Sequence, residues 1–273
     1  MLFRSGGTKA GQKTILGKLL WLLVTQVVIL DEVMRQSGPE NEPFVKLLGW
    51  LRDGKCTDAD YDLLCTRTLQ SSGKNLAKKK WRSCPLIVSN NNVKDALNAH
   101  GAAAFAAQTN QRVHWYYLRD KHSGKTITDP ALQQKLEGLH LGTTKQHLTK
   151  IPLVLGMPVM IAQNFDVQGG VVNGSQGILK KIRYTYDNVG NRILRSGIVE
   201  LPQPENNQSP TPQCPMQHLP PNHVPILPNT TDMTFVHPFS RKRCLIKRTQ
   251  VPILPAFAMT THKAQGQPAK CHH

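Results

Sequence analysis

Apolar residues recur along the chain in short runs, and their spacing predicts alternating helices and strands. Between Pro43 and Arg52 the apolar positions follow helical spacing, and Gly54 is expected to end that helix. A second short helix is predicted over 59–67, capped by the residues just before it. β-branched residues gather at 24–29, which favours a buried strand there.

The middle of the chain contains the pattern of a parallel α/β layer. A short apolar run at 85–88 is followed by a polar turn and then by an Ala-rich helix over 93–108. Residues 109–150 are polar and are expected to be irregular, whereas 158–161 form another predicted strand. These elements predict an α/β fold.

The pattern changes from Val171 onward. Turn signals between apolar stretches over 171–200 predict a hairpin, and the Pro-rich segment 201–230 is expected to be a long loop. Strands are predicted at 243–251 and at 256–260, the latter running directly into a polar segment, 260–266.

Charge is concentrated in the later part of the chain. The 273 residues contain 34 Lys and Arg against 17 Asp and Glu, a net charge of +17. Residues 1–66 have eight basic and eight acidic residues, so the excess lies after residue 66. This asymmetry favours a polyanionic partner, above all nucleic acid, over a neutral metabolic substrate.

Several other classes of site find little support. The longest apolar run is about twelve residues, where a membrane span needs roughly twenty. The six cysteines are far apart and are typical of reduced, intracellular thiols. Their spacing with histidines between residues 214 and 237 fits no standard metal pattern, so no metal site is predicted.

Two segments only partly match nucleotide-binding motifs. In the first, Gln12 separates Gly11 from Lys13, whereas a phosphate loop needs Gly-Lys-Ser/Thr in direct succession. In the second, Asp31 and Glu32 follow an apolar run like a magnesium-binding pair. Only about a dozen residues separate this second segment from the first, too few for the usual intervening helix and strand. A buried strand with solvated acids is the preferred interpretation.

Three segments carry candidate chemistry. Arg35 follows an apolar run, where a guanidinium can reach a phosphoryl group or form a surface salt bridge. Asn91 follows the strand at 85–88, where a polar turn binds phosphate or simply caps the helix. The segment 260–266 places hydroxyl, imidazole, ammonium and amide groups at the end of one strand, or forms a solvated turn.

Taken in their order along the chain, several segments resemble motifs of Pif-like DNA helicases, most closely those carried by Helitron transposons. The matching segments span nearly the whole chain: Met34-Arg35-Gln36, Pro43-Phe44, Leu51-Arg52-Asp53-Gly54, 60–67, the Asn91 turn, 156–161 with Asn164, 172–177 and 261–267.

The resemblance implies a superfamily-one helicase in which two RecA-like domains close on ATP and magnesium and move 5′ to 3′ along single-stranded DNA. This chain would supply the second RecA-like domain, residues 15–165 with 252–273, after a remnant N-terminus at 1–14. A small β-barrel-like insertion, residues 166–251, would interrupt that parallel-sheet domain. Its roles would be in DNA repair, recombination, telomere maintenance or transposition, with a nuclear location.

The resemblance also implies roles for individual residues. Arg35 and Lys263 would be catalytic and converge on one rim of the sheet, with Arg35 reaching the γ-phosphate. The other roles fall into two groups: Gln36, His262, Gln265 and Gly266 would be linked to the nucleotide, and Asn91, Lys94, Asn164, Thr260 and Thr261 would bind DNA. The Asn173-Gly174 pair is interpreted as a turn.

The family's first RecA-like domain, with its phosphate loop and magnesium-binding acids, has no counterpart in these 273 residues. The chain alone is therefore expected neither to bind ATP tightly nor to unwind DNA, unless a longer gene product supplies that domain. A non-enzymatic module that binds single-stranded nucleic acid is the alternative function, and an anionic-membrane binder is a weaker one that lacks a basic amphipathic helix.

Overall fold

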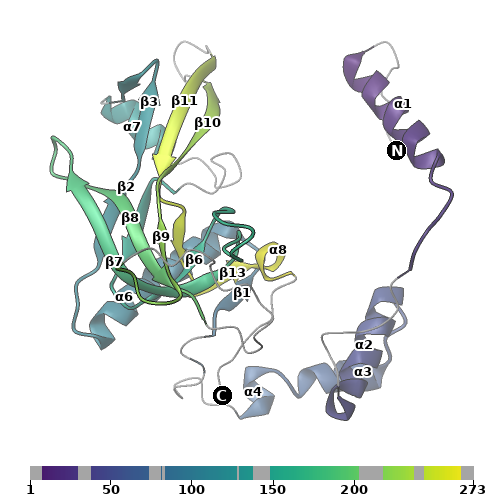
Figure 1. Ribbon diagram of the computed structural model, residues 1–273. Coiled ribbons are helices and arrows are strands. Elements are labelled where there is room, and N and C mark those ends of the chain that lie inside the picture. The colour runs from purple at the N-terminus through teal and green to yellow at the C-terminus, as the bar shows by residue number, and fades with distance from the viewer. Residues whose placement is uncertain are drawn as a thin grey trace. The chain divides into compact units, whose positions relative to one another are not determined.

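The computed structural model describes residues 8–29, 38–73, 81, 84–127, 129–137, 148–202, 218–236 and 243–265. The chain divides into two compact units, residues 1–75 and 76–273 (Figure 1).

The first unit is helical in its described residues. Its elements are α1 (Lys9–Leu22), the 3-10 turn η1 (Pro39–Asn41), α2 (Glu42–Asp53), α3 (Asp58–Cys65) and α4 (Leu69–Ser72). The two predicted helices are confirmed. Gly54 ends α2 in the left-handed conformation, with φ 68°. Thr57 and Asp60 form a capping box that begins α3.

The strand predicted at 24–29 does not form. This segment has no regular structure, and Val27, Val28 and Ile29 are 79–86% exposed. A strand needs a hydrogen-bonding partner, and no described strand pairs with residues 24–29. Its β-branched composition therefore predicted the wrong state.

The second unit contains the predicted parallel α/β layer. β1 (Leu86–Val88) pairs in parallel with β13 (Ala258–Thr260), so that Val88 lies beside Thr260. The helix α6 (Asn91–Gln108) follows β1 and packs against β13. The predicted sequence of strand, turn and helix is confirmed, and with it the α/β class.

A second sheet in this unit is nearly closed into a barrel (Figure 1). Six strands follow one another across it: β12 (Ile253–Pro255), β6 (Pro158–Ile161), β7 (Gln176–Tyr186), β8 (Arg192–Glu200), β2 (His114–Tyr117) and β5 (Lys150–Leu153). A seventh, β9 (His223–Ile226), pairs with β8. The end strands β12 and β5 contact each other, and the main hydrophobic core lies inside.

A four-stranded antiparallel sheet completes the unit. It runs through β10 (Asn229–Val236), β11 (Arg243–Gln250), β3 (Arg119–His122) and β4 (Lys125–Thr126), and α7 (Pro130–Glu137) adds Leu136 to its small core. The expectation that 109–150 is irregular was wrong. Its short strands have little apolar alternation of their own and pair with strands far along the chain, such as β8 and β11. The predicted loop 201–230 likewise contains β9.

The strands of the barrel-like sheet come from both sides of residue 166. β2, β5 and β6 precede this position, whereas β7, β8, β9 and β12 follow it. The domain bounds expected from the sequence stay a prediction, while the sheet itself is shared between the two predicted segments.

A buried ion pair joins β11 to β3, and we predict that it is a main determinant of stability in the four-stranded sheet. Arg248 is 1% exposed, and its Nε and Nη2 donate to Asp120 at 2.9 and 2.7 Å. Nη2 also donates to the carbonyl of Leu136 at 3.3 Å. Replacing Asp120→Ala removes the carboxylate that pairs with this buried guanidinium and should lower the free energy of unfolding by about 3–5 kcal/mol.

Urea denaturation followed by circular dichroism measures this loss. The control is Glu42→Ala, which breaks an exposed ion pair with Lys46 and should leave the midpoint unchanged. An Asp120→Ala protein as stable as the wild type would contradict the prediction.

Candidate functional site

The candidate site lies where the two parallel strands end. Because β1 and β13 run in the same direction and in register, their carboxyl ends meet at one edge. α6 begins just beyond β1, and the short helix α8 (Thr261–Ala264) begins directly after β13 (Figure 1). This edge is where open α/β sheets place their ligands.

Asn98 joins α6 to the first residue of β13. Its Nδ2 donates to the carbonyl of Ala258 at 3.1 Å, and its Oδ1 accepts the amide of Ala258 at 2.8 Å. The side chain is 5% exposed. One side-chain amide therefore satisfies both backbone groups of Ala258, and it fixes α6 against the strand.

Two polar partners surround the ammonium group of Lys94 in the first turns of α6. Lys94 Nζ lies 3.0 Å from Asp95 Oδ1 and 3.4 Å from Asn91 Oδ1. The Lys94 side chain is 9% exposed and that of Asp95 is 31% exposed. Burial raises the pKa of Asp95 even though the charge of Lys94 opposes this shift.

A second ammonium group approaches from the other strand. Lys263, in α8, is half-buried and donates to Asn173 Oδ1. Burial lowers the pKa of Lys263, and the nearby charge of Lys94 lowers it further. Two mutually repelling cations at one strand edge form a local environment that favours an anion such as phosphate.

The β6–β7 connection adds two amides to this group. The backbone amide of Asn173 donates to Asn164 Oδ1 at 2.9 Å. Asn173 thus contacts two predicted site residues directly, Lys263 and Asn164. Two more are linked to it through Lys263, because the charge of Lys94 acts on Lys263 and Lys94 contacts Asn91. We call these five residues the edge network. The sequence alone predicts only a turn at Asn173, and the place of this residue in the family-like segment 172–177 is the signal for a wider role.

The structure places the remaining predicted residues differently. Thr260 is 9% exposed at the end of β13, whereas Thr261, His262 and Gln265 are exposed on and beside α8. Arg35, Gln36 and Gly266 lie outside the described residues, and so does the expected convergence of Arg35 with Lys263.

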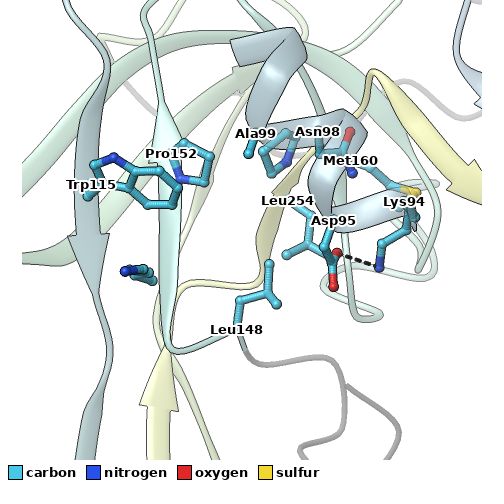
Figure 2. A pocket seen from close by; sticks show the side chains of 11 residues that line it. Lys94, Asp95, Asn98, Ala99, Trp115, Leu148, Pro152, Met160 and Leu254 are labelled. Carbon is cyan, nitrogen blue, oxygen red and sulfur yellow. Dashed lines mark ion pairs between the residues drawn. The ribbon is translucent and has the colours of Figure 1, made fainter. Parts of the chain in front are cut away.

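A pocket of about 190 Å³ opens beside the edge network, between α6 and the barrel-like sheet (Figure 2). Its walls are mostly apolar and include Leu148, Met160 and Leu254. Lys94 and Asp95 lie at one side of the pocket and Trp115 at the other. The ammonium of Lys150 lies 5.4 Å from the centre of the Trp115 ring. The hollow thus combines an aromatic wall with cations.

The described residues offer neither a cluster of metal ligands nor a membrane-spanning helix. They contain no group of three or more His, Cys, Asp or Glu side chains that could hold a metal ion. None of the helices that can be described is long and apolar enough to cross a bilayer.

We predict that Asn98→Ala lowers the stability of the fold that supports the candidate site. The change leaves the amide and carbonyl of Ala258 buried without their partner, so the free energy of unfolding should fall by about 2–4 kcal/mol. Asn98→Asp keeps the acceptor but loses the donor and should be intermediate. Urea denaturation measures both variants against Asn92→Ala, an exposed position in the first turn of the same helix. Equal stability of Asn98→Ala and Asn92→Ala would refute the clamp.

Comparison with known proteins gives a consistent result. No known family model matches the chain. The chain is 23% identical over 242 residues to the ATP-dependent DNA helicase PIF1 of Xenopus laevis. The matched region covers 89% of this chain and 30% of that protein.

Two solved structures have a similar fold. The Pif1 helicase from Candida albicans matches with a TM-score of 0.56 and 20% identity, over 98% of this chain and 53% of that one. The Pif1 helicase from Bacteroides in complex with ADP-AlF3 and ssDNA matches with a TM-score of 0.54 and 18% sequence identity, over 96% of this chain and 51% of that one. The chain thus spans about a third to a half of these proteins. The resemblance predicted from the motifs is confirmed: the chain is similar to Pif1 helicases in sequence and has their fold.

Proposed function

We propose that this chain functions as part of an ATP-dependent DNA helicase that moves along single-stranded DNA, and that its edge network contacts the DNA backbone. The observation that carries the proposal is the meeting of Lys94 and Lys263 with three asparagine side chains at the carboxyl edge of β1 and β13. Similarity to Pif1 helicases supports the wider activity.

The chemistry of the edge network suits a phosphodiester. Each ammonium group is partly or largely removed from water, and each repels the other, so a bound anion would relieve both costs. The surrounding amides can donate hydrogen bonds to phosphate oxygens and to bases. Lys263 donates to Asn173, whose backbone amide donates to Asn164, and its pKa is affected by the charge of Lys94. Since Asn164 and Lys94 are both predicted to bind DNA, we assign Lys263 to DNA contact rather than to the nucleotide.

The nucleotide would be held elsewhere in the complete helicase. ATP hydrolysis supplies the free energy for movement, and magnesium would accompany the nucleotide. We propose that Arg35 contacts the γ-phosphate. His262 and Gln265 flank the DNA-contacting Lys263, and we propose that they couple the nucleotide state to DNA binding. Because the substrate is DNA, we place the protein in the nucleus.

The proposal predicts a specific effect of Lys263→Met on DNA binding. The variant removes one phosphate contact, so it should bind an oligothymidylate more weakly. The slope of log K against log salt should become shallower by about 0.7. Fluorescence anisotropy at several salt concentrations measures both quantities.

Lys125→Met is the matched control, because it removes an exposed lysine from β4 in the four-stranded sheet. It should change neither the affinity nor the slope by as much. Wild-type affinity and slope in Lys263→Met would overturn the assignment of the edge network.

A further inference from the structure

A row of three tyrosines runs from the core to the surface near the free end of the β7–β8 hairpin. Tyr116 on β2 is 2% exposed, Tyr184 is 38% exposed and Tyr186 is 60% exposed. The ring centres of Tyr116 and Tyr184 are 5.6 Å apart, and those of Tyr184 and Tyr186 are 5.5 Å apart. Both pairs meet edge to face, at 71° and 88°. The outermost ring is therefore exposed yet supported by packing that extends into the core.

Arg192 adds a cation to this row. It lies directly across from Tyr186 in the antiparallel pair and beside Tyr116 in the parallel one. Its guanidinium carbon is 5.1 Å from the centre of the Tyr184 ring. Hydrogen bonds to Tyr184 and to Arg192 hold the pKa of Tyr186 below its ordinary value. These contacts fix the Tyr186 ring before any ligand arrives.

The turn that joins β7 to β8 is also fixed. Asp187 Oδ1 accepts the backbone amides of Val189 and Asn191 at 2.9 and 2.8 Å. Gly190 takes the left-handed conformation at φ 86°, and its amide donates to the carbonyl of Asp187 at 3.1 Å. An exposed aromatic ring on a fixed hairpin loses little conformational entropy when it binds.

Further positive charge lies around the same hairpin. Arg183 and Arg195 are on β7 and β8, and Arg195 Nε donates to Thr185 Oγ1 at 3.0 Å. Burial lowers the pKa of Arg119, and the neighbouring charge of Arg195 lowers it further. The carboxylate of Asp187 is already occupied by the turn. The end of the hairpin thus offers several cations to a polyanion.

We propose that this hairpin end is a second nucleic-acid contact, in which Tyr186 stacks on a base of the single strand and Arg192 contacts an adjacent phosphate. An exposed aromatic ring with flanking arginines is the arrangement by which proteins bind single strands without sequence preference. The inference rests on the proposed function and extends it, because nothing in the edge network requires this hairpin.

The two contacts lie at opposite ends of one strand. β7 begins at Gln176, three residues after Asn173 of the edge network, and it ends at Tyr186. Its eleven residues span roughly 35 Å along the strand at the usual rise. A single strand of several nucleotides could therefore bind at both ends.

A proline-rich peptide is the other ligand that exposed tyrosines commonly bind. Binding of such a peptide does not require positive charge on the protein. In contrast, arginines gather at the hairpin end, and the chain as a whole has a net charge of +17. The charge therefore favours the single-stranded nucleic acid.

The test compares Tyr186→Ala and Tyr186→Phe with the wild type in oligothymidylate binding at several salt concentrations. Loss of a stacked base should weaken binding about five- to hundredfold. It should leave the salt slope unchanged, because stacking releases no counterion. Tyr186→Phe keeps the ring and should restore most of the affinity. Tyr61→Ala, at a tyrosine that is 68% exposed in the first unit, is the matched control.

Each outcome decides the question. Weak binding by Tyr186→Ala with an unchanged slope and rescue by Tyr186→Phe supports the stacking site, even if Lys263→Met has no effect. Equal binding by Tyr186→Ala and Tyr61→Ala overturns it and leaves the edge network intact. Failure of the wild type to bind overturns both proposals. Binding of a proline-rich peptide that is lost in Tyr186→Ala, with DNA binding unchanged, also overturns the stacking site.

Discussion

The pairing of β1 with β13 is the constraint on which the rest of the site depends. These three-residue strands are distant in the chain, and their register brings the first turns of α6 to the start of α8. Asn98 satisfies the backbone amide and carbonyl of Ala258, the first residue of β13. Lys94 and Lys263 are thereby held close enough for the charge of Lys94 to lower the pKa of Lys263.

The β7 strand connects this cationic edge to the end of the β7–β8 hairpin. One end of β7 adjoins the amides of the β6–β7 connection, and the other end presents Tyr186 beside Arg192. The first end suits phosphate recognition and the second suits stacking on a base. In our proposal the barrel-like sheet therefore also spaces two chemically different DNA contacts along one strand.

The sequence predicted the elements whose signals are local. The cap at Thr57, the left-handed Gly54 and the turn before α6 each depend on a few neighbouring residues, and each was correctly predicted. The strands within 109–150 were missed because their partners lie far along the chain. At 24–29 the composition favoured a strand, but no described partner pairs with it. The role of Asn173 was missed for the same reason, since it depends on Lys263.

Native-state hydrogen exchange tests the central pairing most directly. The amide of Leu86 donates to the carbonyl of Phe257 at 2.8 Å, and that of Ala258 donates to Asn98. Both amides should be protected in the wild type and should lose protection together in Asn98→Ala, while the amides of β10 and β11 keep theirs. Rapid exchange of Leu86 and Ala258 in the wild type would contradict the account.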